Sequence, residues 1–420
     1  MLVPDKQRRF AVEVVRKLRQ ARFEAYWAGG CVRDELLGRL PKDFDVATNA
    51  RPPEIRRLFG RRRTLAIGAA FGVITVLGPK ESGQIEVATF RQDAAYSDGR
   101  HPDSVAFSTA QADASRRDFT INGLFYDPID EQVIDYVGGQ EDLRRGVLRA
   151  IGNPHERFEE DKLRMLRAVR FCTTFGFSLE ADTLSAIRRM ASEINAVSAE
   201  RIAIEIERML VDPSRTVAVR LLLETGLAPA ILPEIVPHDD AEQARLDRAL
   251  AVLEKLDQPS FPLVLAALLH DLTDLPGAER VCRRWRLSNQ QTARVGWLVA
   301  HGASLRDTRS MRWSTLQPIL IADGIEDLLA LNEAMARAGS GDTSDVEYCR
   351  SLLEQPREVL DPPPLLTGND LIEHGVPSGP AYRALLHQVR NAQLDHQIHT
   401  KAEALELVER WINENRNRSG

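Results

Sequence analysis

Apolar and polar residues follow two different periods along the chain. Residues 5–22 place apolar side chains at helical spacing among charged ones, which predicts an amphipathic helix. Short apolar runs follow between turns marked by Gly and Pro, and they predict strands at 43–48, 64–67, 72–77, 84–90, 104–107 and 133–136. From about residue 143 onward the helical period dominates, and it predicts helices that include 160–175, 181–191, 199–210 and 214–224. The pattern therefore predicts an α/β first third followed by helices with short connectors.

The length and composition indicate a soluble protein with several domains. A chain of 420 residues is too long for one ordinary core, so two to four domains are expected. Three successive prolines at 362–364 cannot continue a helix and mark the clearest late boundary. No apolar run approaches about 18 residues, and the N-terminus lacks the apolar core of a signal peptide. We therefore predict a cytoplasmic protein without a membrane partner.

Charge and cysteine content leave a nucleic-acid partner open. The net charge is −6, but binding responds to local clusters, and most basic residues are Arg, which pairs bidentately with phosphate. The four cysteines lie far apart, without a CxxC motif or a metal-ligand spacing. This usage is typical of a reduced cytosolic protein without structural zinc.

The segment from Gly29 to Asp45 carries the most informative chemistry. Gly29 and Gly30 let backbone N–H groups approach a phosphate without a Cβ in the way, at the start of a predicted helix that carries Arg33. Asp43 and Asp45 alternate along the next predicted strand, so they point to one face with Cα atoms roughly 6.5 Å apart. Two carboxylates that close suit a pair of Mg²⁺ ions about 3.5–4 Å apart, as used for in-line phosphoryl displacement.

A third acidic candidate is Glu86 in the alternating strand at 84–90. If this strand pairs beside the strand of Asp43 and Asp45, three carboxylates converge on the metal ions. The alternative is a solvated glutamate on an edge strand. Beside the acidic pair, the catalytic interpretation is favoured.

The stretch at 115–123 combines cations with an acid and an amide at what we expect to be the start of a helix. Arg117 can hold triphosphate oxygens, while Asp118 or Asn122 hydrogen-bonds a ribose hydroxyl. A helix cap with a surface salt bridge is the alternative.

The predicted helix at 158–171 places Asp161 and Arg164 three residues apart, and Arg167 and Arg170 continue a basic stripe. An Asp beside an Arg offers an acceptor and donors suited to the Watson–Crick edge of a base. An ordinary salt bridge on an exposed helix would look the same, and from these residues alone that interpretation is favoured.

Five motifs together resemble the superfamily of class II tRNA nucleotidyltransferases and bacterial poly(A) polymerases. They are Gly29-Gly30-x-x-Arg33-Asp34, Asp43-x-Asp45, Arg116-Arg117-Asp118-x-x-x-Asn122, Glu160-Asp161-x-x-Arg164 and Val197-Ser198-Ala199-Glu200-Arg201. The motifs stand in the family's order and approximate spacing over residues 25–210. Each motif alone is common, whereas the joint match is very specific.

The resemblance implies an α+β fold with a nucleotidyltransferase head like that of polymerase β, a mixed sheet with helices, followed by all-α domains. The domains would be a catalytic head at 1–148, a helical neck at 149–225 that binds nucleotide and RNA, a body at 226–360 and a tRNA-binding tail at 361–420. The loop at 91–113 lies where the family carries a flexible element used in switching from C to A addition.

The resemblance also implies roles for individual residues. Asp43 and Asp45 would bind Mg²⁺, and Gly30, Arg33 and Arg117 would contact the phosphates and sugar of the incoming nucleotide. Asp161 and Arg164 would act as the protein template that selects CTP or ATP. Arg167 and Arg170 would bind nucleotide or RNA phosphates. Glu200-Arg201 would brace the template helix.

A short segment at 268–272 resembles the metal motif of HD phosphohydrolases, a domain fused to some members of this family. A working site would need another His upstream, and Arg248 occupies the place where it is expected. We therefore interpret His270-Asp271 as a degenerate, structural remnant, and a working HD phosphohydrolase is the less favoured alternative.

The combined interpretation is a Mg²⁺-dependent enzyme that adds CMP and AMP from CTP and ATP to the 3′ end of tRNA without a nucleic-acid template, releasing pyrophosphate. Recognition would use tRNA shape and backbone, and no stable protein partner is expected. The motifs leave open an enzyme that adds only A, or a poly(A) polymerase. A non-catalytic RNA-binding protein is less favoured, because both metal carboxylates are retained.

Overall fold

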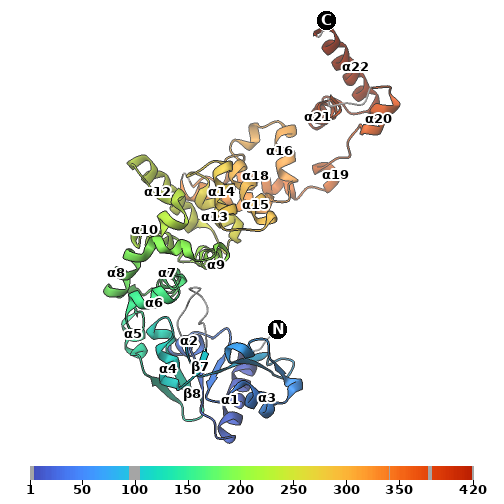
Figure 1. The fold of residues 1–420 in the computed structure, drawn as a ribbon. Helices are drawn as coiled ribbons and strands as arrows, with labels where there is room; N and C mark the ends of the chain where they lie inside the picture. Colours follow the sequence, from blue (N-terminus) through green and yellow to red (C-terminus); the bar gives the residue numbers. More distant parts are fainter. Residues whose placement is uncertain (1–3, 94–104, 340, 377–380, 419–420) are drawn as a thin grey trace. The chain divides into compact units, whose positions relative to one another are not determined.

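The computed structural model describes residues 4–93, 105–339, 341–376 and 381–418 (Figure 1). Contacts divide the chain into two compact units, 1–236 and 237–420, and each is described by itself. The predicted loop at 91–113 lies partly outside the described residues. Its described ends form β6 (Arg91–Asp93) and β7 (Val105–Phe107), which pair antiparallel, and α4 (Ala110–Ser115). The four predicted domain ranges stay predictions.

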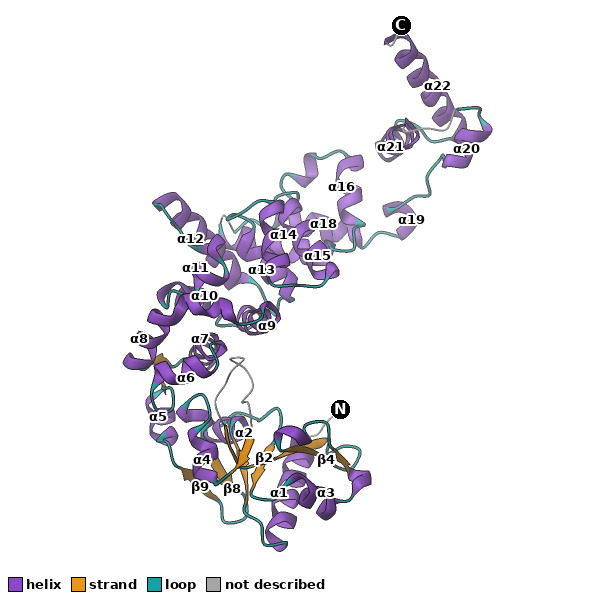
Figure 2. Cartoon of the chain, viewed as in Figure 1, coloured by secondary structure: helices purple, strands orange, loops and turns teal. Residues whose placement is uncertain are grey.

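The first unit begins with a seven-stranded mixed sheet of order β3-β4-β5-β2-β1-β8-β9 (Figure 2). Its strands are β1 (Ala25–Ala28), β2 (Asp45–Thr48), β3 (Thr64–Leu65), β4 (Val73–Leu77), β5 (Gln84–Thr89), β8 (Leu124–Asp127) and β9 (Gln132–Asp135). Only β2 and β5 pair in parallel, and this pair brings Asp45 into register with Glu86. The predicted mixed sheet of the head is therefore confirmed.

Helices cover the two faces of this sheet unequally. The helices α1 (Pro4–Gln20) and α3 (Pro52–Phe59) pack on one face, where the buried side of α1 carries Phe10, Val14 and Leu18. On the other face, Ala28 and Ala47 pack with Ala110 and Ala114 of α4. Because Asp45 lies two residues before Ala47, alternation along β2 places its carboxylate on this second face. Asp45, the first residue of β2, therefore lies at the edge of the sheet face that α4 covers.

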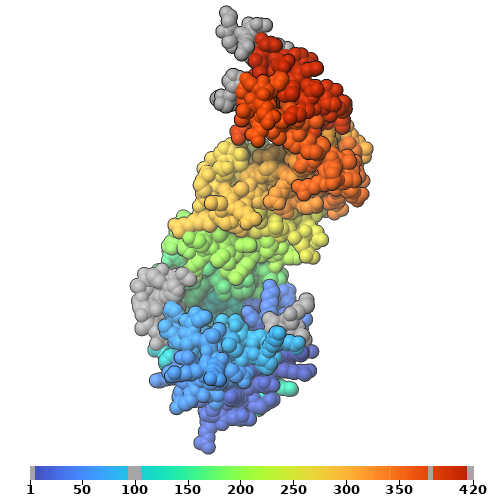
Figure 3. Space-filling model, turned by 90° about the vertical axis from the view of Figure 1, so that its right-hand side faces the viewer, coloured from blue at the N-terminus to red at the C-terminus, as the bar shows by residue number. Residues whose placement is uncertain are grey.

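Helices follow the sheet within the same unit. They are α5 (Gly139–Arg145), α6 (Pro154–Glu160), α7 (Leu163–Phe175), α8 (Ala181–Met190), α9 (Ala199–Leu210), α10 (Arg215–Glu224) and α11 (Ala228–Ile231), with the two-residue parallel strands β10 (Val147–Leu148) and β11 (Ser178–Leu179) between some of them. The helix α7 packs against α9 and α10. Figure 3 shows the sheet-bearing part, in blue, adjoining these first helices, in teal and green.

Four predictions of local structure were wrong in detail. The predicted helix at 160–175 is broken between α6 and α7, and Asp161 lies in the break with extended backbone. The predicted strand at 43–48 begins at Asp45, so Asp43 lies just before it. The stretch at 115–123 follows the end of α4 and continues into a 3-10 turn at Thr120–Asn122, instead of starting a helix. The central strands β1 and β8 were not predicted.

The second unit is helical throughout its described residues, as predicted. Its helices are α12 (Asp240–Lys255), α13 (Phe261–Leu269), α14 (Leu275–Arg284), α15 (Asn289–His301), α16 (Trp313–Leu320), α17 (Ile325–Ala338), α18 (Ser344–Leu353), α19 (Arg357–Leu360), α20 (Gly368–Glu373), α21 (Ala381–Leu394) and α22 (Lys401–Arg418). The helix α13 is apolar all round and packs against α12, α15 and α17, as expected for a central helix. Leu371, Leu385, Val389 and Val408 belong to a separate small core in the last third of this unit. Among the described helices, none is long and apolar enough to cross a membrane.

Candidate active site

A single turn between β1 and α2 (Gly30–Leu36) determines the entrance of the site. Gly29 has φ +72° and ψ −123°, a conformation that side chains with a Cβ rarely adopt. A Cβ on Gly29 would lie 2.6 Å from Arg117 Nη1, which is too close for any real contact. A Cβ on Gly30 would meet only Arg33 Nη2, at an ordinary 3.6 Å. The geometry therefore favours glycine strongly at position 29, whereas position 30 has room for a Cβ.

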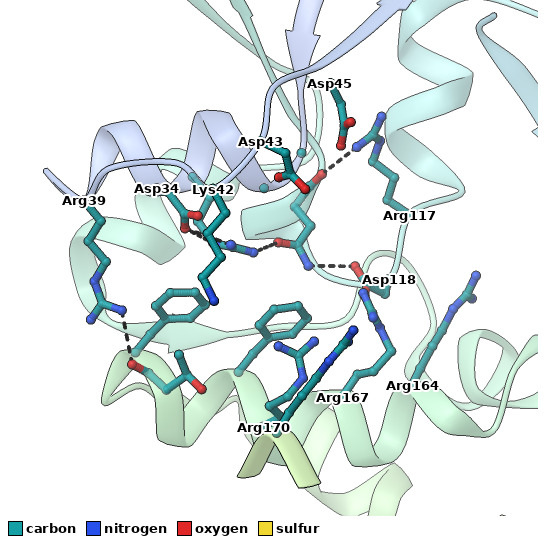
Figure 4. A pocket seen from close by; sticks show the side chains of 18 of the residues that line it. Asp34, Arg39, Lys42, Asp43, Asp45, Arg117, Asp118, Arg164, Arg167 and Arg170 are labelled. Carbon is teal, nitrogen blue, oxygen red and sulfur yellow. Dashed lines mark hydrogen bonds and ion pairs between the residues drawn. The ribbon is translucent and has the colours of Figure 1, made fainter. Parts of the chain in front are cut away.

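This turn opens into a cavity of about 850 Å³ within the first unit, a volume suited to a nucleotide-sized ligand (Figure 4). Nine basic and five acidic side chains line it. The basic ones are Arg33, Arg39, Lys42, Arg116, Arg117, Arg164, Arg167, Arg170 and Arg208, and the acidic ones are Asp34, Asp43, Asp45, Asp118 and Asp161. The excess of cations gives a chain of net charge −6 a local site for polyanions.

The structure brings almost all predicted site residues into this one cavity. The predicted residues that line it are Gly29, Gly30, Arg33, Asp43, Asp45, Arg117, Asp118, Asn122, Asp161, Arg164, Arg167 and Arg170. They come from segments up to 141 positions apart in the sequence, between Gly29 and Arg170. Glu86 is the exception, because it is not among the lining residues.

Asp43 and Asp45 stand out as the acids of the cavity that lack an ion pair with any described residue. Burial raises the pKa of Asp45 to about 6, with further contributions from the charges of Asp43 and Glu86, while Arg117 acts in the opposite direction. Asp45 is accessible from the cavity, but the surrounding protein displaces much of the water that would stabilise its charge. A divalent cation would relieve this repulsion, so the donor set fits one.

The predicted convergence of three carboxylates is not seen. Among the described residues, no three His, Cys, Asp or Glu side chains gather closely enough to hold one metal ion. One or two carboxylates, with water and substrate phosphates, can hold a hard divalent cation, so Asp43 and Asp45 would be a sufficient protein contribution. A direct catalytic role of Glu86 stays a prediction, and its visible effect is on the charge state of Asp45.

Asp118 lies at the centre of a buried network that connects the head to α7. Its Oδ1 accepts hydrogen bonds from Phe119 N and Asn122 Nδ2, both at 2.9 Å. Its Oδ2 accepts from Arg167 Nε at 3.0 Å and Nη2 at 2.7 Å. Burial alone would raise the pKa of Asp118, but Arg167 and Asn122 outweigh it and hold the pKa at about 2. With about four acceptor positions on a carboxylate, Asp118 has none left for a ribose hydroxyl, and that prediction now depends on Asn122.

Arg33 and Arg117 are held in place by neighbouring side chains of the same unit. Arg33 Nη1 donates to Asn122 Oδ1 at 2.6 Å, and its guanidinium stacks 4.5 Å from the ring centroid of Phe175. Arg117 donates to Asp113 Oδ2 from Nε and Nη2, at 3.3 and 3.0 Å. The buried Asp113 also binds Arg116, through Nε and Nη2 at 2.9 and 2.8 Å. These contacts fix the guanidinium groups before any ligand binds.

Asp161 and Arg164 both line the cavity, but they do not form the salt bridge that their spacing suggested. Asp161 Oδ2 accepts from Arg201 Nη2 at 2.7 Å, and Asp161 Oδ1 accepts from Leu163 N at 3.1 Å. Arg164 Nη1 pairs instead with Glu160 Oε2 at 2.5 Å. The break between α6 and α7 turns the two side chains away from a common helix face. The predicted brace from Arg201 is present.

Sequence reasoning missed two buried acids behind the arginines, although each left a signal. Asp113 stands three and four residues before Arg116 and Arg117, which is the spacing of ion pairs on a helix. Glu205 stands on the apolar face of α9, between Ile202 and Ile206, where a charge requires a partner.

The HD-like segment lies in the second unit and has lost its metal-ligand arrangement. Arg248 Nη2 pairs with Asp271 Oδ2 at 2.6 Å, so a guanidinium neutralises the carboxylate of the motif. His270 contacts Ala267 O through Nδ1 at 2.8 Å. These contacts agree with the interpretation of the segment as a structural remnant.

Comparisons with known proteins agree with this site. Family models match in three places: the poly A polymerase head domain at 25–149, the probable RNA and SrmB-binding site of polymerase A at 176–238, and tRNA nucleotidyltransferase domain 2 at 263–408. A CCA-adding enzyme of Enterococcus faecalis is 38% identical over 77% of this chain and 76% of that protein, and one of Geobacillus kaustophilus is 34% identical over 97% of both. The crystal structure of the Bacillus stearothermophilus CCA-adding enzyme in complex with CTP is similar with a TM-score of 0.76, at 29% identity, over 99% of this chain and 100% of that one. The chain therefore belongs to the family of CCA-adding enzymes.

Proposed function

We propose that this chain adds CMP and AMP, from CTP and ATP, to the 3′ end of tRNA without a nucleic-acid template and releases pyrophosphate. The observation that carries the proposal is that Asp43 and Asp45, which have no ion pair with a described residue, share one cavity with Asp161, Arg164 and several further arginines. The names of the relatives support the same reaction. We further propose a cytoplasmic location for this activity.

In the proposed reaction the terminal 3′-hydroxyl of the RNA attacks the α-phosphorus of the nucleotide. The bond to the oxygen that bridges the α- and β-phosphates breaks, and pyrophosphate leaves with that oxygen. Asp43 and Asp45 would hold Mg²⁺, which when bound stabilises negative charge on the attacking and leaving oxygens. The turn at Gly29 and the pre-positioned Arg117 and Arg33 would bind the triphosphate, with little reorganisation because their guanidinium groups are already fixed.

Base selection is assigned to Asp161 and Arg164. Cytosine and adenine both present an amino donor beside a ring-nitrogen acceptor, whereas uracil and guanine reverse this order at the matching edge. A carboxylate acceptor beside guanidinium donors complements the first pattern and opposes the second. Because Arg201 and Leu163 N each use one acceptor position of Asp161, the carboxylate keeps a fixed orientation and still has free lone pairs.

A tRNA that lacks its 3′ CCA tests the proposal when it is supplied with CTP and ATP separately and together. We expect two C residues with CTP alone and a complete CCA end with both nucleotides. Addition of A only to a tRNA that already ends in CC, with no use of CTP, would instead identify an A-adding enzyme. Long A tails would identify a poly(A) polymerase. Asp43→Ala is the matched control, and wild-type activity in that variant would overturn the assignment of the acidic pair.

A further inference from the structure

Glu205 is a buried carboxylate that stands behind the arginines of the cavity without reaching it. It lies on α9 and is 3% exposed, and it is not among the residues that line the cavity. Its Oε2 accepts a hydrogen bond from Arg170 Nε at 2.6 Å. Its Oε1 lies 3.4 Å from Arg208 Nη1 and 3.9 Å from Arg167 Nη1. All three arginines line the cavity, so one hidden acid faces three of its cations.

The nitrogens of the Arg170 guanidinium face different partners. Its Nε donates backward to Glu205, and its plane lies 4.1 Å from the ring centroid of Phe171. Its two terminal nitrogens form no hydrogen bond with a described residue, so their N–H groups are available to a ligand. Arg167 is held by a different acid, because its Nε and Nη2 both donate to Asp118, and its Nη1 lies 3.9 Å from Glu205 Oε1. A buried charge is tolerated only when it is paired, and here the pairing sets the direction of the partner.

We propose that Glu205 is a positioning residue of the nucleotidyl transfer: it orients Arg170 so that the terminal N–H groups of this guanidinium hold phosphate oxygens during the reaction. The inference rests on the proposed function for the identity of the ligand. Glu205 acts only through the arginines and touches neither nucleotide nor RNA. Its contribution is orientation, because its negative charge by itself opposes the binding of phosphate.

The first test compares Glu205→Gln and Glu205→Ala with the wild type by steady-state CMP and AMP addition. We expect kcat to fall about tenfold or more in Glu205→Ala, since guanidinium groups that are no longer aimed lose much of their effect on the transition state. The KM values for CTP and for tRNA should change less than about threefold, because the pocket keeps its cations and loses one anion. Glu205→Gln keeps an acceptor for Arg170 Nε and should recover part of kcat. Which KM value moves more reports whether the arginines face the nucleotide or the RNA.

Glu224→Gln is the matched control for the loss of a neck glutamate. Glu224 lies at the end of α10, pairs with Arg188 at 3.2 Å and is exposed, away from the cavity lining. We expect wild-type kinetics from it. If Glu205 served only the packing of α9, Glu205→Gln and Glu205→Ala would lower the unfolding temperature but leave kcat unchanged below that temperature, and this result would overturn the proposal.

A double-mutant cycle with Arg170→Ala tests whether Glu205 acts through this arginine. We expect Glu205→Gln to reduce kcat in the wild-type background and to add little once Arg170 is absent. Fully additive losses would show that Glu205 acts by another route and would refute the inference.

A spectroscopic readout separates this inference from the proposed function. The short contact between Arg170 Nε and Glu205 predicts an Arg170 Nε–H resonance that exchanges slowly with water in isotope-labelled wild-type protein and quickly in Glu205→Ala. A wild-type protein that adds no nucleotide would overturn the proposed function, whereas the absence of the protected resonance would overturn the role of Glu205 whatever the activity.

Discussion

Substitution of Gly29 by alanine is expected to disable the site by two effects that the structure separates. The first is backbone strain at φ +72° and ψ −123°, which costs about 1–3 kcal/mol for a residue with a Cβ. The second is the displacement of Arg117, whose Nη1 lies 2.6 Å from the position of the new Cβ. Arg117 would lose its fixed place between Asp113 and the Asn122 carbonyl, and a hydrogen bond of a charged group contributes about 1.5–3 kcal/mol.

The two effects together come to about 2.5–6 kcal/mol, and only the backbone strain also applies to an ordinary glycine with positive φ. Gly38 provides the matched control in the same part of the chain, because it has φ +67° and nothing within 4 Å of a Cβ. Gly38→Ala is expected to cost about 1–2 kcal/mol in strain alone. The difference between the two variants therefore combines the displacement of Arg117 with the strain at Gly29 in excess of that at Gly38.

Thermal unfolding and nucleotide addition measure the two variants. For a unit of this size, about 4 kcal/mol corresponds to a fall in unfolding temperature of about 8–16 °C, against a few degrees for Gly38→Ala. The KM for CTP should rise in Gly29→Ala and stay near wild type in Gly38→Ala, because only the former moves Arg117. Equal unfolding temperatures and equal KM values in the two variants would refute the reasoning.

Three further outcomes are expected. Asp45→Asn should abolish nucleotide addition and yet stabilise the metal-free protein above pH 6, because a raised pKa means that folding disfavours the charged carboxylate. This gain in the free energy of unfolding should shrink as the pH falls from 6 to 4. Unfolding curves that show no gain in stability at pH 7 would contradict the prediction. Asp118→Asn should destabilise the protein by about 2 kcal/mol at pH 7, since the pKa of Asp118, about 2, lies below the ordinary 3.8. Urea unfolding should show that the stability difference between wild type and variant disappears as the pH falls from 4 to 2. A stability difference that does not depend on pH would exclude the ion pair with Arg167 as its cause. Asp161→Ala should lower the preference for CTP and ATP over UTP and GTP by about 10–100-fold in misincorporation assays. Arg201→Ala should cause a smaller loss, because it removes the hydrogen bond that orients Asp161. An unchanged preference in both variants would show that Asp161 does not select the base.

The sequence predicted most of the site because its chemistry is local. The Gly29 turn and the Asp43-x-Asp45 spacing are recognisable within 17 residues, and each motif places its own side chains. It failed where partners come from elsewhere in the chain. Asp161 was placed on a continuous helix because apolar residues keep the helical period on both sides of it. In the structure its carboxylate accepts from Leu163 N, a local bond that competes with the helix and starts a new one.

The missed strands β1 and β8 have a related cause. They are short and central, with buried residues such as Trp27 and Phe125 directly beside buried alanine or leucine, so the alternation that identifies a half-buried strand is absent. Their pairing is set by the sheet and not by their own pattern. The register of Asp45 with Glu86 meets the condition, left open by the sequence, that the two strands lie side by side.

The buried acids behind the arginines also determine how far the electrostatic attraction of the cavity extends into the solvent. Asp113 behind Arg116 and Arg117, and Glu205 behind Arg170, turn isolated cations into oriented pairs whose field falls off faster than that of a lone charge. A nucleotide approaching from the solvent therefore meets little long-range attraction from a protein of net charge −6, and meets strong attraction only at contact. Because this electrostatic attraction acts over a short range, a departing pyrophosphate is released from it soon after it loses contact with the arginines.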